Sequence, residues 1–304
     1  MKSSARLSQR LNAIADDVEA VSNALRPRFE VHVAVTARER IEAARLVAQA
    51  YVQEGYLSQY DGGELRPFLS PHHLLNETTI FMVKNGARIV ATLAVIRDSR
   101  AGLPMEELYG AEIAKLRKDG RRLCEICSLA VELESGRQNS GLVLELFKAA
   151  NTYARCVANA DDVCLTIKPS HAPFYSRIAF EEFGGFKLDE RFAFAETLAM
   201  RLRRETVEAI ADSGRGLDRK SRLMARVFSV HSSDEQKRIR AELDASVSSS
   251  REVLNSISWL PEILARATPK QIEYLWQTQN RRISTSNLEG SIRQHDRNSV
   301  LVSC

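Results

Sequence analysis

Glu125 is an acidic residue inside an otherwise apolar stretch, Cys124 to Val131, whose composition and alternation predict a buried strand. Burial raises the pKa of a carboxyl group because it penalises the charged form, and such a group is suited to accept a proton from an amine. We therefore predict that Glu125 is a general base. A structural ion pair with Arg122 or Lys168 would explain the residue equally well. A regular strand would place on the Glu125 face Leu123, Cys127, Leu129 and Val131.

The segment from Arg137 to Val143 leads from this strand into a long amphipathic helix, expected from about Asn139 to Ala158. Backbone N–H groups at such a helix entry form a natural anion site. The turn partly resembles the Gln/Arg-x-x-Gly-x-Gly/Ala loop with which GNAT acyltransferases hold the pyrophosphate of coenzyme A, but an ordinary Asn/Ser helix cap is an equal alternative. The predicted thioester-binding residues are Leu129, Ala130, Val131, Gln138, Asn139, Ser140 and Gly141.

A third group of candidates follows the next predicted strand, in the segment from Pro169 to Arg177. In GNAT folds a tyrosine on the helix after the fifth strand lies near the departing thiol, so Tyr175 is predicted to donate a proton or a hydrogen bond there. His171 is a second catalytic candidate because histidine titrates near neutral pH. The alternative is that Tyr175 packs in the core and that His171 lines a turn.

Cys124 and Cys127 form a C-x-x-C pattern, which needs to be weighed as a metal or redox site. Residues three apart on a strand point to opposite faces, so neither a chelate nor a disulfide forms easily. We expect two buried core thiols and no metal.

The composition is that of an ordinary globular protein. The chain has 304 residues, 44% of them hydrophobic and 27% charged, with a net charge of +4 and five cysteines. There is no run of five or more Lys and Arg, no secretory pattern at the N-terminus and no apolar run long enough to cross a bilayer. We expect a cytoplasmic protein with free thiols that does not bind nucleic acid.

The order of predicted elements indicates a mixed α/β (α+β) sheet flanked by helices. We predict three parts: an N-terminal helix in residues 1–28, the mixed domain in 29–202, and a helical C-terminal extension in 203–304. Thr36 and Glu39 predict a capping box, and Asn85-Gly86 predicts a hairpin turn. The predicted strands span 29–35, 78–84, 88–97, 123–131, 162–168, 183–188 and 192–202. Beyond 203, helices are predicted over 232–250 and 268–282.

Three segments together resemble the FeeM-type long-chain N-acyl amino acid synthases, which are related to the acyl-homoserine lactone synthases. They are Ala91 to Val131, with its Gly-Leu-Pro-Met and Glu-x-x-Ser-Leu-Ala-Val motifs, Leu144 to Arg155, and Asp161 to Gly184. The resemblance implies a GNAT-like fold over about residues 29–202. It also implies transfer of an acyl group from the phosphopantetheine thioester of acyl carrier protein to the α-amine of an amino acid, with no tightly bound cofactor. Lys168 and the segment Ile178 to Phe180 depart from the family pattern.

This interpretation extends to further residues. Backbone N–H groups near Leu129 to Val131 are expected to bind the oxyanion. The acyl chain is expected to lie against Phe81, Leu93, Val95 and Phe147. The amino acid is expected near Tyr60, Arg66, His72 and His73. An acidic carrier protein is expected to meet Arg121, Arg122, Arg137, Lys148 and Arg155.

Two other functions remain open from the sequence. One is a coenzyme A-dependent N-acetyltransferase. The other is a catalytically silent GNAT-like module whose C-terminal helices serve as a regulatory arm. In either case the same helices are candidates for a homo-oligomer contact.

Overall fold

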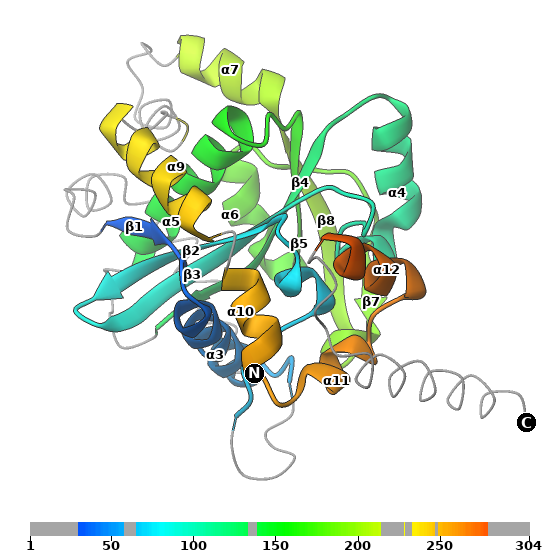
Figure 1. The fold of residues 1–304 in the computed structure, drawn as a ribbon. Coiled ribbons are helices and arrows are strands. Elements are labelled where there is room, and N and C mark those ends of the chain that lie inside the picture. The colour runs from blue at the N-terminus through cyan, green and yellow to red at the C-terminus, as the bar shows by residue number, and fades with distance from the viewer. Residues whose placement is uncertain are drawn as a thin grey trace, which may run out of the picture.

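The protein is described by a computed structural model that covers residues 30–57, 65–132, 139–213, 228, 233–246 and 249–278. The predicted N-terminal helix lies outside these residues. A mixed, mostly antiparallel sheet of eight strands forms the centre of the fold, in the order β1-β2-β3-β4-β5-β8-β6, with β7 also paired to β8 (Figure 1). The strands are β1 Val31–Val33, β2 Thr78–Asn85, β3 Arg88–Arg97, β4 Leu123–Val131, β5 Asp162–Ile167, β6 Glu181–Glu182, β7 Lys187–Asp189 and β8 Ala195–Arg203.

The strands before Asp162 follow the sequence prediction closely. β2 and β3 form the predicted hairpin, with Gly86 at a φ of 62° in the turn, and β3 pairs antiparallel with β4. β4 and β5 are parallel, so the chain must cross over between them, which α5 (Asn139–Cys156) does. The last two predicted strands were too long: of the 183–188 run only Lys187 and Leu188 lie in a strand, β7, and β6 precedes the run. β8 starts only at Ala195, after the 3-10 helix η4 (Glu190–Phe192) and two left-handed residues.

Helices cover both faces of the sheet. Apolar residues of α5 pack on one face, in a large cluster that includes Phe81, Leu93, Leu146 and Leu165. α3 (Ala37–Gln53) and α4 (Glu106–Lys118) pack on the other face in two smaller clusters. The predicted capping box is present: the Thr36 side chain accepts from Glu39 N, and the Glu39 carboxylate accepts from Thr36 N at 3.1 Å.

β4 and β5 separate part of the way along their length. The two strands pair only from Leu123 to Glu125, opposite Asp162 to Cys164, although β4 continues to Val131 and β5 to Ile167. Glu125 is therefore the last residue of β4 that is paired on both sides. From Ile126 to Val131, no described strand pairs with this side of β4.

The C-terminal region is helical, as predicted, and packs against the sheet domain. Its described helices are α7 Arg204–Ser213, α9 Ser233–Ser246, α10 Ser249–Ser256, α11 Leu260–Leu264 and α12 Pro269–Thr278. α9 contacts the edge strand β1, where Glu242 accepts from Val33 N at 2.8 Å. α10 lies beside α3 (Figure 1). In the part of the chain that the structure describes, no helix is long and apolar enough to cross a membrane.

Candidate active site

Glu125 lies at the point where β4 and β5 begin to separate. The residue is 2% exposed, and its Oε2 accepts a hydrogen bond from Met105 N at 2.9 Å. Burial raises the pKa of Glu125 to about 8; the Met105 N–H and the nearby Arg191 oppose this rise without cancelling it. The carboxyl group thus combines a fixed position with a pKa close to neutral, which is the combination a general base needs.

A β-bulge follows three residues after Glu125, at Ser128. Ala94 and Thr92 of β3 lie opposite Cys127 and Ala130, so β4 contains one residue more than its partner over this interval. Ser128 has a φ of 53°, as expected for the left-handed residue of such a bulge. The extra residue reverses the alternation of the strand. Leu129 and Val131 therefore pack on the α5 face, and the prediction that they share the Glu125 face was wrong.

The side chain of His73, which lies in the segment before β2, contacts the bulge. Its Nε2 lies 3.0 Å from Ser128 Oγ, while its Nδ1 accepts from Ser70 N at 3.1 Å. Because Nδ1 is an acceptor, the ring proton is on Nε2 and is donated to Ser128. Burial lowers the pKa of His73 to about 3, so the ring is neutral at physiological pH. The sequence predicted His73 only as one of four contacts to the amino acid substrate. It gave no sign of the pairing with Ser128, which lies far away along the chain.

The separated edge of β4 carries backbone N–H groups. Glu132 N donates to Val90 O of β3, so alternation along the strand turns the N–H of Val131 toward the opposite edge. No described strand pairs with that edge beyond Glu125. Ala130 is another predicted thioester-binding residue, and its backbone N–H points toward β3 instead. Gly141 lies in the first turn of α5, together with Asn139 and Ser140, and Gln138 lies outside the described residues.

Tyr175 and His171 lie beyond the end of β5. The Tyr175 ring is 6% exposed and packs against Phe147, Phe174 and Phe180. Burial raises the pKa of its hydroxyl well above the usual value, so the group stays protonated. The Nε2 atom of His171 is buried and has no hydrogen-bond partner among the described residues, and burial lowers the pKa of this ring.

An aromatic cluster lies between α3 and the β7–β8 connection. Tyr51, Tyr56, Phe68 and Phe192 contact one another with ring centroids 4.9 to 6.0 Å apart. Burial and the nearby Cys127 thiol raise the pKa of Tyr51, and a hydrogen bond with Ser128 opposes them, so this cluster reaches the bulge. Sequence reasoning missed the cluster because its members come from three separate elements.

The residues predicted to line the acyl path fill the interior. Phe81, Leu93 and Val95 are fully buried between the sheet and α5, and Phe147 lies with them. The other amino-acid contacts are dispersed. His72 faces Gln271, Arg66 pairs with Glu262, and Tyr60 lies outside the described residues.

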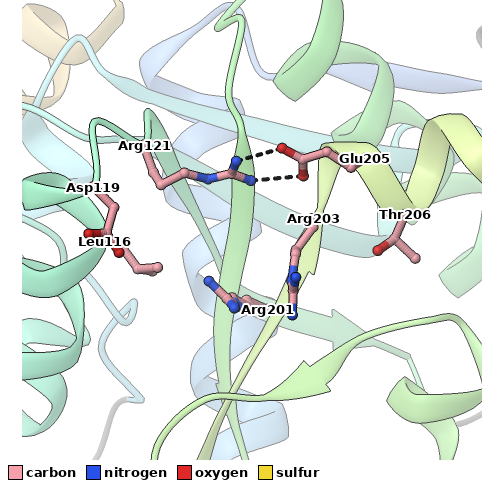
Figure 2. Close-up of a pocket in the computed structure, with 7 residues that line it drawn as sticks. All are labelled: Leu116, Asp119, Arg121, Arg201, Arg203, Glu205 and Thr206. Carbon is pink, nitrogen blue, oxygen red and sulfur yellow. Dashed lines mark hydrogen bonds and ion pairs between the residues drawn. The ribbon is translucent and has the colours of Figure 1, made fainter.

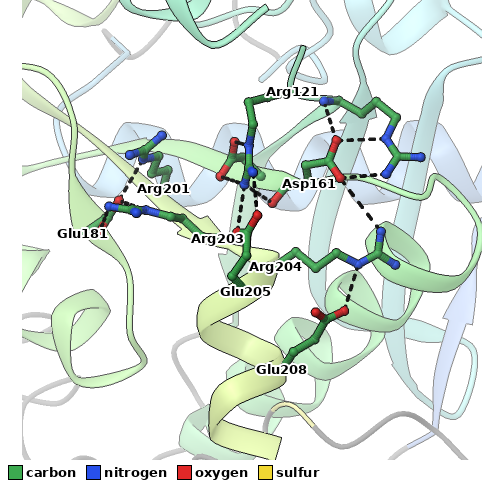
Figure 3. Close-up of polar contacts among 10 residues, drawn as sticks. Arg121, Asp161, Glu181, Arg201, Arg203, Arg204, Glu205 and Glu208 are labelled. Atoms are coloured by element: carbon green, nitrogen blue, oxygen red, sulfur yellow. Dashed lines mark hydrogen bonds and ion pairs between the residues drawn. The ribbon is translucent and has the colours of Figure 1, made fainter. Parts of the chain in front are cut away.

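The arginines predicted to meet a carrier protein take part in internal ion pairs. Arg121 binds the buried Asp162 at 2.7 Å and also Glu205 of α7, and Arg122 binds Asp161 (Figure 3). With Arg201 and Arg203, Arg121 also lines a polar surface crevice of about 230 Å³ (Figure 2). This crevice is near the start of β4, away from the bulge. Arg121 links the sheet to α7 through Asp162 and Glu205. Arg137 lies outside the described residues.

Loss of Arg121 is expected to destabilise the fold without affecting the site. In Arg121→Ala the Asp162 carboxylate, whose side chain is 0% exposed, loses its cation, at a cost of roughly 2–4 kcal/mol. The half-exposed Arg122 gives the matched control, because Arg122→Ala should cost less than about 1 kcal/mol. Urea unfolding measures the free energy of unfolding of both variants. Equal costs for the two variants would contradict the assignment.

The fold and site together define an acyltransferase with a GNAT-like sheet. The family model for the N-acyl amino acid synthase FeeM matches residues 42–203. The chain therefore belongs to the FeeM family of N-acyl amino acid synthases.

Several solved structures are similar to this chain. FeeM, an N-acyl amino acid synthase from uncultured soil microbes, is 28% identical with a TM-score of 0.50, and the match covers 58% of this chain and 92% of that chain. The acyl-homoserine lactone synthase LasI matches at 12% identity and a TM-score of 0.42, over 58% of this chain and 88% of that one. BjaI, a coenzyme A-dependent acyl-homoserine lactone synthase, matches at 17% identity and a TM-score of 0.44, over 64% of this chain and 98% of that one. Among curated proteins, none matches the chain.

Proposed function

We propose that this protein transfers a long-chain acyl group from acyl carrier protein to the α-amine of an amino acid. The observation that carries the proposal is the buried Glu125 at the divergence of β4 and β5, three residues before the Ser128 bulge. Membership of the FeeM family supports the same chemistry. The sheet domain, residues 29–202, is the proposed catalytic unit, with 203–304 as its helical extension.

In the proposed reaction the amine nitrogen attacks the thioester carbonyl carbon. Glu125, directly or through a water molecule, accepts the proton that the amine loses. The open-edge N–H of Val131 stabilises the oxyanion as the carbonyl becomes tetrahedral. The C–S bond then breaks and the electron pair leaves with the sulfur of the phosphopantetheine arm. Gly141 and its neighbours at the N-terminus of α5 bind the single phosphate of that arm.

Tyr175 is proposed to stabilise the leaving thiolate by a hydrogen bond. We expect Tyr175→Phe to lower kcat about tenfold, because one hydrogen bond to an anion is lost in the transition state. Stability should hardly change, since the ring keeps its contacts with Phe147 and Phe180. Tyr153→Phe is the matched control: Tyr153 is equally buried but packs against Phe81 in the core. Steady-state assays with each variant measure kcat. An equal loss of kcat in both variants would remove Tyr175 from the mechanism.

A direct assay tests the function. The purified protein is incubated with each amino acid and with acyl donors from acetyl to long-chain, presented either on acyl carrier protein or on coenzyme A. Mass spectrometry then detects N-acyl amino acids. A long-chain product formed faster from the carrier protein supports the proposal. Preference for acetyl-CoA would favour the N-acetyltransferase, and no product with any donor would favour the silent module.

A further inference from the structure

The 3-10 helix that carries His73 is enclosed by the C-terminal helices. This helix, η1 (Pro71–Leu74), follows Leu69 and precedes Leu75. These leucines pack in one apolar cluster with Ala44 of α3 and with residues of the extension, namely Val253, Leu254, Ile257, Leu260, Ile263, Leu264 and Leu275. The position of His73 therefore depends on residues that lie outside the FeeM family match, which ends at residue 203.

Polar contacts from α12 fix the same segment. Gln271 Nε2 lies 3.2 Å from the Nε2 of His72, the direct neighbour of His73. Tyr274 OH donates to Glu77 Oε1 at 2.7 Å, just before β2. Burial lowers the pKa of His72 to about 4, so its ring nitrogen is free to accept the Gln271 proton at physiological pH.

α12 also reaches the loop that holds Glu125. That loop ends in Met105, whose N–H donates to the Glu125 carboxyl group. Burial raises the pKa of the adjacent Glu106, but hydrogen bonds from Arg117 and Leu103 N, together with the charge of Lys270, lower it overall. Burial and Glu77 raise the pKa of Tyr274, and a hydrogen bond with Ser99 of the same loop opposes them. One helix thus contacts both segments that support the site.

We propose that α12 is a positioning element of the acyltransfer site, with Gln271 and Tyr274 as positioning residues that hold His73 on the bulge and Met105 on Glu125. This inference rests on the proposed function, because it assigns Glu125 and the bulge to the reaction. It gives the C-terminal extension a direct part in positioning the groups of the catalytic unit. The physical basis is preorganisation: groups that must be fixed within a fraction of an ångström need a second layer that is itself fixed.

The test uses the full chain with Gln271→Met and Tyr274→Phe combined. These replacements keep the apolar packing and remove the contacts with His72, Glu77 and Ser99. They also remove the hydrogen bond that Gln271 Oε1 accepts from Thr268 N at the start of α12. Glu262→Gln is the control. Glu262 lies in the same extension, and its replacement removes only an exposed ion pair with Arg66 of the sheet domain. We expect the double variant to lower kcat/KM for the amino acid about tenfold while the KM for the donor stays within about twofold. The control should match the parent protein.

Two further readouts separate positioning from general loosening. In a Glu125→Gln background the same pair of substitutions should have a smaller effect, because the carboxylate that they position is absent and only the effect through the bulge remains. The half-buried Cys127, beside Ser128, should react faster with a thiol reagent in the double variant, as followed by peptide mass spectrometry.

Unchanged kinetics, or equal losses with and without Glu125, would overturn the proposal. If no acceptor yields a product in any form of the protein, the proposed function fails first, and the Cys127 labelling rate still decides whether α12 fixes the bulge. An unchanged labelling rate would then overturn the positioning role as well.

Discussion

Glu125→Gln is expected to lower kcat by a factor of roughly 10² to 10⁴, the usual contribution of a general base. The substitution keeps the shape of the side chain, and the amide oxygen can still accept from Met105 N. The variant should also lose the part of the pH–rate profile that rises with an apparent pKa near 8, because only the ionised carboxyl group can accept the proton. Steady-state rates measured from pH 6 to about pH 9 test both points.

The same substitution is expected to stabilise the protein at alkaline pH. The folded pKa of about 8 lies above the ordinary value of 4.5, so between these values the folded state binds one proton more than the unfolded state. Stability therefore falls as the pH rises through this window, by up to about 5 kcal/mol. The glutamine side chain cannot ionise, so the variant lacks this loss. Urea unfolding at pH 5 and pH 8.5 should show the variant gaining on the parent protein with rising pH; a constant difference would place Glu125 in a solvated or ion-paired state instead.

Ser128→Val is expected to have the second largest effect, on both stability and activity. Valine is branched at Cβ and disfavours the left-handed φ of 53°, at a cost of about 1–2 kcal/mol. It also leaves the buried His73 Nε2–H without its acceptor, at a cost of about 1–3 kcal/mol. If the bulge is lost, the strand slips by one residue and the N–H of Val131 turns away from the open edge. We therefore expect a total destabilisation of roughly 2–5 kcal/mol and a rate loss of about a hundredfold or more.

Two matched variants divide that effect into its parts. Ser128→Gly accepts the left-handed conformation but lacks the hydroxyl, so it should show only the cost of the lost hydrogen bond. Ser128→Asn tolerates the same φ and offers an oxygen to His73, so it should be the mildest of the three. Unfolding and rate measurements on all three give the comparison. Equal rates in the valine and asparagine variants would show that the bulge geometry is not needed for transfer.

Local patterns determined much of this protein. Thr36 and Glu39 formed the predicted cap, and Asn85-Gly86 the predicted hairpin turn, because each depends on neighbours within a few residues. The strand that carries Glu125 and the long helix after it were also predicted, since apolar periodicity reports one buried face directly. Burial of a carboxyl group in that strand, with a raised pKa, followed from the same reasoning.

The tertiary structure alone decided how the site is assembled. An extra residue at Ser128 shows only against the register of β3, and it reversed the predicted faces of Leu129 and Val131. The contact between His73 and Ser128, and that between Gln271 and His72, join residues 55 and 199 positions apart. Such pairs leave no periodic signal in one sequence, because their geometry depends on how separate elements pack and not on local backbone preference. The sequence identified the buried carboxyl group and its strand, and packing determined what holds them in place.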